Sequence, residues 1–149
     1  MILSEFKDFP RVGRILGIDW GARRIGVAVT DEGQEFFFTR PQIVLGRSDD
    51  GLDAVAQTVV VERVAAVVVG LPLRTDGTLS DTTRRVYDWA EKLAAQMSVP
   101  IFMIDETLSS ASAQESFAKC RRRDIKEKLD SAAARVILEN AIAMARRVL

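Results

Sequence analysis

The sequence predicts an α/β domain built on a mixed β-sheet, in which a three-strand antiparallel meander is joined to parallel strands and flanked by helices. Three strand patterns follow one another closely between residues 14 and 44, separated by turns that contain glycine. Residues 64–71 form a nearly continuous β-branched apolar run, which is typical of a strand buried on both faces. Helical and strand patterns alternate after the meander, so parallel pairing is expected there.

Local patterns define the elements in the first half of the chain. Strands are predicted at residues 14–19, 25–31 and 35–44, with a tight turn at 21–24 and a second turn at 31–33. A helix should begin within residues 49–53 and end near Glu62, because apolar residues recur there at helical spacing. The apolar strand at 64–71 follows this helix.

The second half of the chain continues the alternation. Thr78 or Ser80 should cap a helix with this apolar face: Val86, Trp89, Ala90, Leu93 and Met97. A strand is expected at 101–104, a helix at 108–118, and the longest helix at 129–149, after a basic segment at 119–128. We interpret residues 1–13 as a poorly anchored N-terminal extension and residues 14–149 as one domain.

The composition excludes several reaction classes. The chain has no histidine and one cysteine. Ser-His-Asp and Cys-His catalysis, zinc sites that need imidazole, and internal disulfides are therefore excluded. Carboxylate, lysine, tyrosine and water remain for acid–base or metal chemistry. No apolar stretch is long enough to span a bilayer, and the N-terminus lacks a secretion pattern, so secretion is not expected.

Asp19 interrupts a strand pattern, and glycines at 17, 21 and 26 leave room near it for a ligand or another backbone. An ionised carboxylate in such surroundings is costly unless a charge or a metal partners it. Two further acidic sites, Asp105-Glu106 and Asp130, are expected at a strand end and at a helix start. Carboxylates from three elements suggest a site for Mg²⁺ or Mn²⁺ of the kind that supports two-metal phosphoryl transfer.

Each acidic site also has a structural interpretation. Asp130 could cap the last helix, and the pair Asp105-Glu106 could cap the helix predicted from residue 108. Because alternate strand residues face opposite ways, only one member of that pair would point toward the metals. The basic segment 119–128 is either a solvated loop or a phosphate-binding surface.

Four motifs, in order along the chain, resemble the YqgF/RuvX family of pre-16S ribosomal RNA nucleases and Holliday-junction-resolvase-like proteins. Residues 17–31 (GIDWGARRIGVAVTD) are similar to the family's opening motif, and residues 68–77 (VVGLPLRTDG) to its central loop. Residues 105–110 (DETLSS) resemble its acidic motif, and residues 129–139 its final helix. The resemblance covers roughly residues 14–145.

The resemblance implies an RNase H-like fold and a nuclease site at Asp19, Glu106 and Asp130 that holds Mg²⁺ or Mn²⁺, with two ions expected. It implies hydrolysis of nucleic-acid phosphodiester bonds in processing the 16S rRNA precursor during ribosome biogenesis. It also implies a cytoplasmic location in a bacterium. No membrane partner is expected, and a homodimer is left open. The residues expected to bind nucleic acid are all basic: Arg23, Arg24, Arg121, Arg122, Arg123, Lys126 and Lys128.

Three other functions compete with this one. A Holliday junction resolvase would cut branched DNA. A phosphotransferase of the actin and sugar-kinase type has a similar acidic strand–turn–strand, but needs two domains, which 149 residues cannot supply. A catalytically idle RNase H-like binding module would be expected to lose acids that are kept here. The chain also departs from the family pattern at Trp20, at Arg74-Thr75 and at Thr107, the last of which replaces a frequent arginine.

Overall fold

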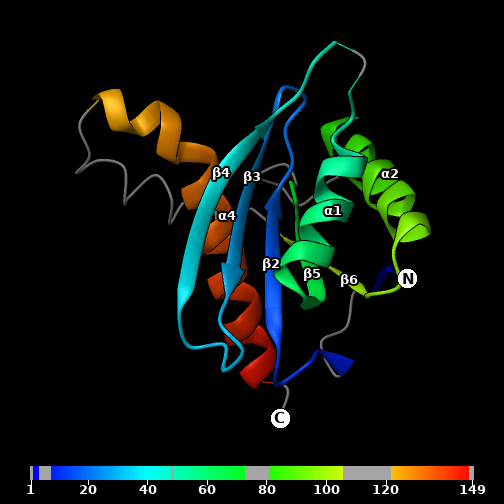
Figure 1. Ribbon diagram of the computed structural model, residues 1–149, viewed down its shortest axis with the longest axis vertical. Helices are drawn as coiled ribbons and strands as arrows, with labels where there is room; N and C mark the ends of the chain where they lie inside the picture. The colour runs from blue at the N-terminus through cyan, green and yellow to red at the C-terminus, as the bar shows by residue number, and fades with distance from the viewer. Residues whose placement is uncertain (1, 4–7, 48, 73–80, 106–121, 148–149) are drawn as a thin grey trace.

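A computed structural model describes residues 2–3, 8–47, 49–72, 81–105 and 122–147, and for residues 2–3, 105 and 122–131 it describes the backbone. Its strands are β1 (Ile2–Leu3), β2 (Arg14–Asp19), β3 (Arg24–Thr30), β4 (Phe37–Val44), β5 (Val64–Leu71) and β6 (Ile101–Asp105). Its helices are α1 (Leu52–Glu62), α2 (Asp81–Gln96) and α4 (Arg122–Arg147). The strands form one six-stranded sheet with helices on both faces (Figure 1).

The sheet has the order β1-β6-β5-β2-β3-β4. β2, β3 and β4 are paired antiparallel, whereas β5 pairs parallel with β2, and β6 parallel with β5. The predicted mixed sheet, with its meander, is confirmed. Because β2, β5 and β6 are parallel, their last residues lie at one edge of the sheet, which we call the carboxyl edge. Open α/β sheets bind ligands at this kind of edge.

Two apolar cores lie on opposite faces of the sheet. On one face, Val67 and Val69 of β5 belong to the core that includes buried residues of α1 and α2. On the other face, Ala66 and Val68 pack in the core formed with α4, which includes Ile137. β5 is therefore buried on both faces, as its continuous apolar sequence predicts.

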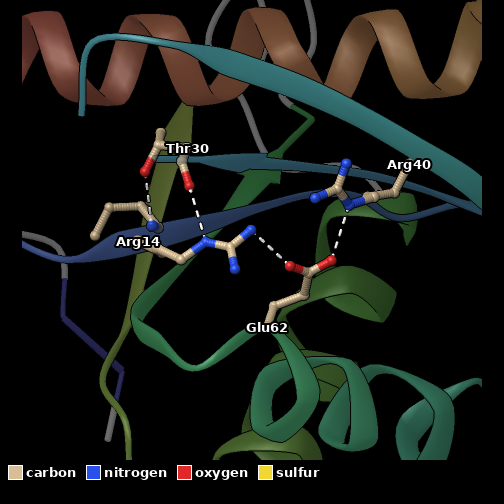
Figure 2. A network of polar contacts seen from close by, with 5 residues as sticks. Arg14, Thr30, Arg40 and Glu62 are labelled. Atoms are coloured by element: carbon tan, nitrogen blue, oxygen red, sulfur yellow. Dashed lines mark hydrogen bonds and ion pairs between the residues drawn. The ribbon is translucent and has the colours of Figure 1, made fainter. Parts of the chain in front are cut away.

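Glu62, the last residue of α1, fastens that helix to two strands (Figure 2). Its carboxylate oxygens lie 2.6 Å from Nη2 of Arg14 in β2 and 2.8 Å from Nε of Arg40 in β4. Nε of Arg14 also donates to the Thr30 carbonyl at 3.2 Å. The hydrogen bond from Arg40, aided by the charges of both arginines, outweighs burial and lowers the pKa of Glu62 below its ordinary value.

The N-terminal segment is better anchored than the sequence predicts. Ile2–Leu3 pairs in parallel with β6. Phe9 is buried, with its ring centroid 4.9 Å from that of Phe102. The expectation of poor anchoring is therefore wrong for these residues, because a segment without its own periodicity can still add to an existing sheet and apolar surface.

α4 begins at Arg122 rather than at residue 129, so residues 122–128 belong to the helix. The stretch contains no glycine or proline, and Asp124 stands four residues before Lys128, a spacing at which opposite charges support a helix. The helix predicted at 108–118 and its neighbours lie outside the described residues, as do Thr78 and Ser80. Although α4 spans 26 residues, neither it nor any other described helix is apolar enough to cross a membrane.

Candidate functional site

Asp19 ends β2 in the interior of the sheet. β2 lies between β5 and β3, and Asp19 pairs with Gly26 of β3. Its backbone is therefore held on a strand that has neighbours on both sides. The residue is partly exposed, which leaves its carboxylate within reach of a ligand at the carboxyl edge.

Gly17 identifies the face of the sheet to which Asp19 belongs. A Cβ atom at Gly17 would lie 2.9 Å from the Ala134 carbonyl oxygen and 3.0 Å from Leu138 Cβ, so Gly17 lies directly under α4. Successive strand residues alternate between faces, and Asp19 is two residues further along β2. Asp19 thus shares the α4 face with Gly17.

The end of β6 lies at the same edge. Leu71 of β5 pairs with Asp105 of β6, and Val69 of β5 pairs with Ile18 of β2. Asp105 is therefore the last residue of a strand that is separated from β2 by β5. Glu106, the predicted member of the acidic pair, lies outside the described residues.

α4 runs antiparallel to β2 (Figure 1). Near the end of α4, Nη2 of Arg146 donates to the Gln34 carbonyl at 2.9 Å, and Nε2 of Gln34 donates at 3.1 Å to the carbonyl of Gly13, which precedes β2. Further back along the helix, Ala134 lies at Gly17. Residue 130 is one helical turn earlier, about 6 Å along the axis, and Asp19 is about 7 Å beyond Gly17 along the strand. The backbone of residue 130 therefore lies closer than Ala134 to the Asp19 end of β2.

An open pocket of about 370 Å³ adjoins Asp19 and is lined by the turn that follows it, residues 19–24. Gly21 is required in this turn, because a Cβ atom there would lie 2.6 Å from the Arg24 carbonyl oxygen. Arg23 and Arg24 are exposed and line the pocket together with Asp19. Two of the predicted phosphate-binding cations therefore lie beside the predicted metal ligand.

The other predicted site residues are described in part or not at all. Arg122, Arg123, Lys126 and Lys128 lie on the first turns of α4, where the structure gives the backbone, and Arg121 lies outside the description. Among the described residues, no three histidine, cysteine, aspartate or glutamate side chains gather into a potential metal site. That set leaves out Glu106 and the side chain of Asp130. As an oxygen donor on a fixed strand end, Asp19 suits a hard divalent cation.

Arg85 of α2 was not singled out by any sequence motif. Its guanidinium carbon lies 5.3 Å from the centroid of the Trp20 ring, next to Asp19 in the chain. A pocket of about 260 Å³ is lined by Trp20, Arg85 and nearby residues of α2. An exposed arginine on the polar face of an amphipathic helix gives no sequence signal, since its aromatic partner comes from a distant strand end.

Comparisons with known proteins agree with this architecture. The sequence profile of the RuvX family, described as Holliday junction resolvase, matches residues 13–144. A protein of Maridesulfovibrio salexigens named "Putative pre-16S rRNA nuclease" is 38% identical over 136 residues, covering 89% of this chain and 99% of its own length. A protein of Orientia tsutsugamushi with the same name is 35% identical over 152 residues, covering 95% of this chain and 94% of its own.

Solved structures of resolvases share the fold. RuvC of Thermus thermophilus gives a TM-score of 0.54 at 14% sequence identity, covering 91% of this chain and 96% of its own. The yeast mitochondrial Holliday junction resolvase Ydc2 gives 0.56 at 9% identity, covering 96% of this chain and 84% of its own. At these identities the likeness concerns the fold alone, and it confirms the predicted RNase H-like fold.

Proposed function

This chain belongs to the RuvX family, and from that premise we propose that it is a divalent-metal-dependent nuclease that processes the precursor of 16S ribosomal RNA. Membership makes it a hydrolase of phosphodiester bonds. Relatives that align with this chain over nearly their whole length are named as nucleases of the precursor RNA. We infer a cytoplasmic location, where ribosomes are assembled.

We propose Asp19, Glu106 and Asp130 as the metal ligands. This proposal rests on the close packing of α4 against Gly17 at Ala134. With the helix in this position, the backbone of residue 130, one turn before Ala134, lies toward the Asp19 end of β2. Ile104 belongs to the core on the α4 face of β6. We choose Glu106 rather than Asp105 because, if strand alternation continued past Ile104, residue 106 would share its face.

The chemistry follows from these donors. Mg²⁺ or Mn²⁺ held by carboxylates supplies the Lewis acidity that phosphodiester hydrolysis requires. Asp19 offers a rigid carboxylate on β2, which limits the reorganisation needed when substrate arrives. Arg23 and Arg24, in the pocket beside Asp19, would hold the phosphates that flank the cut bond.

A second candidate function is resolution of four-way DNA junctions. It is favoured by the description of the family profile and by the fold shared with RuvC. The two functions use the same proposed carboxylates and differ in substrate. Purified protein should therefore be incubated with Mg²⁺ or Mn²⁺ and with matched precursor-RNA and four-way DNA substrates. We expect cleavage of the RNA; cleavage of the junction alone would favour the second function.

Substitutions test the metal ligands in the same assay. Asp19→Asn and Glu106→Gln should abolish cleavage and largely preserve binding, because a neutral amide keeps the shape but is a weak metal ligand. Asp105→Asn should have a milder effect. Asp53→Asn, at an exposed acid in the first turn of α1, is the matched control. Full metal-dependent activity of Asp19→Asn would refute the proposed site, and a stronger effect at Asp105 than at Glu106 would reverse the choice within the pair.

A further inference from the structure

Trp20 separates two pockets at the carboxyl edge. One is the pocket lined by residues 19–24, and the other lies between Trp20 and the exposed side of α2. Both are lined by Trp20, so the two pockets adjoin at this residue, the first beside Asp19 and the second beside Arg85. A nucleic-acid strand that leaves the first pocket past Trp20, around the carboxyl edge toward α2, would meet Arg85.

Arg85 is held in place by an aromatic ring. Its guanidinium lies over the Trp20 ring at 5.3 Å from the centroid, a distance typical of a cation–π contact. The indole Nε1 of Trp20 is buried, so the ring is seated with its N–H edge inward. A guanidinium stacked on a ring keeps its N–H donors at the rim, where they can bind a phosphate through two hydrogen bonds.

Arg85 forms no ion pair with any residue in the described part of the chain. Two acids share its pocket, Asp50 and Asp88. The Asp50 carboxylate accepts a hydrogen bond from the Leu52 N–H at 3.1 Å, at the start of α1. Asp88 lies three residues after Arg85 and four before Lys92 on α2, and Lys92 also lines the pocket. Arg85 and Lys92 are the cations that line this pocket, and Arg85 is the one that lies over the Trp20 ring.

We propose that Arg85, oriented by Trp20, binds a backbone phosphate of the substrate strand beyond the cleaved bond. This proposal rests on the proposed nuclease function and adds a contact on the α2 side of the carboxyl edge. Trp20 is then a positioning residue, since it acts through Arg85. Because phosphate contacts carry no sequence information, the contact should strengthen binding to different sequences alike.

The test compares Arg85→Ala with Arg84→Ala. Arg84 is the adjacent exposed arginine of α2, and it does not line the pocket at Trp20. Binding of fluorescein-labelled precursor RNA and of a labelled four-way DNA junction is measured by anisotropy in EDTA at several salt concentrations. Arg85→Ala should weaken binding about tenfold or more. It should also reduce the slope of log affinity against log salt by about 0.7–0.9. Arg84→Ala should change neither quantity appreciably.

Two more variants separate phosphate binding from a structural role. Arg85→Lys keeps the charge but loses the planar fork, so its affinity should lie between those of the parent and Arg85→Ala. If Trp20 acts through Arg85, Trp20→Leu should itself weaken binding. Adding Arg85→Ala to Trp20→Leu should then weaken binding by less than Arg85→Ala does in the parent. Melting temperatures of all variants are measured in parallel. A lower melting temperature of Arg85→Ala without a change in salt slope would assign Arg85 to structure and overturn the proposal.

The outcomes also distinguish the two proposals. If the parent cleaves one of the substrates and Arg85→Ala binds it as well as Arg84→Ala does, the phosphate contact is refuted and the nuclease function stands. If the parent neither binds nor cleaves either nucleic acid with Mg²⁺ or Mn²⁺, the proposed function is refuted and the phosphate contact with it.

Discussion

At the scale of single residues, Gly17 controls how closely α4 approaches β2. The atoms that a Cβ there would meet, the Ala134 carbonyl oxygen and Leu138 Cβ, belong to or directly adjoin the helix backbone. They cannot move aside as the tip of a flexible side chain could. A side chain at residue 17 would therefore displace the helix, and with it residue 130.

We predict that Gly17→Ala lowers the free energy of unfolding by about 1–3 kcal/mol, the usual effect of overpacking a filled core. It should also slow cleavage, because displacement of α4 separates the proposed ligands. Thermal denaturation and the cleavage rate check both effects. Gly46→Ala is the matched control, since nothing lies within 4 Å of a Cβ atom built there. Parental stability and activity of Gly17→Ala would show that the contact tolerates a side chain.

At the scale of elements, Glu62 joins α1 to β2 and β4 through two ion pairs, and its side chain is 17% exposed. We predict that Glu62→Gln lowers the free energy of unfolding at neutral pH by about 1–2 kcal/mol, because the amide loses both charge-assisted contacts. Glu139→Gln breaks the exposed pair of Glu139 with Arg135 on α4 and should cost less than about 0.5 kcal/mol. Chemical denaturation of the three proteins measures the difference.

The effect of Glu62 should depend on pH in a defined direction. Its pKa is lowered in the folded protein from the ordinary value of 4.5. The stabilisation is therefore complete above that value and is lost as pH falls through the folded-state pKa. The stability difference between the parent and Glu62→Gln should be constant near neutral pH and should shrink in acid below pH 4.5. A difference that widens in acid would contradict the assignment of these ion pairs.

The N-terminal turns of α4 give a prediction for the basic segment. Replacing Arg121, Arg122 and Arg123 by Ala should weaken binding across sequences and reduce the salt slope by about 0.7–0.9 for each lost phosphate contact. A variant in which the exposed residues Arg47, Arg84 and Arg147 are replaced by Ala loses three arginines elsewhere and should retain the parental slope. Anisotropy titrations at several salt concentrations compare the two. An unchanged slope in the first variant would assign its arginines to a solvated surface.

At the scale of the whole molecule, the proposed carboxylate cluster links metal binding to folding. Without metal, Asp19, Glu106 and Asp130 would repel one another, whereas the unfolded chain lets them separate. Asp19→Asn removes one charge at nearly constant volume, so the metal-free variant should be more stable than the metal-free parent by about 0.5–2 kcal/mol. Melting temperatures in EDTA measure this difference.

Adding Mg²⁺ or Mn²⁺ should then raise the melting temperature of the parent and leave that of Asp19→Asn nearly unchanged, because a ligand that binds the folded state stabilises it by mass action. Asp53→Asn should respond to metal as the parent does. If parent and Asp19→Asn melt together both with and without metal, the carboxylates do not form a cluster.

Elements with their own strong pattern could be predicted from the sequence. The apolar run of β5 and the meander β2–β4 lie where the pattern indicates, with β5 at Val64–Leu71 as expected. The N-terminal segment and the start of α4 could not be predicted in the same way. Pairing of Ile2–Leu3 needs β6 as a template, and residues 122–128 carry charge without the apolar spacing by which we delimited the helix.

The sequence by itself determined the chemistry available to this protein. Without histidine, and with an acidic residue set among glycines at the end of a strand, carboxylates and hard cations were the remaining choice. Tertiary structure alone decided which groups meet. The antiparallel course of α4 over Gly17 directs residue 130 toward Asp19, and the packing of α2 brings Arg85 over Trp20. These contacts depend on how the helices pack across the sheet. A local sequence pattern does not predict that packing, because it indicates only the secondary structure of its own segment.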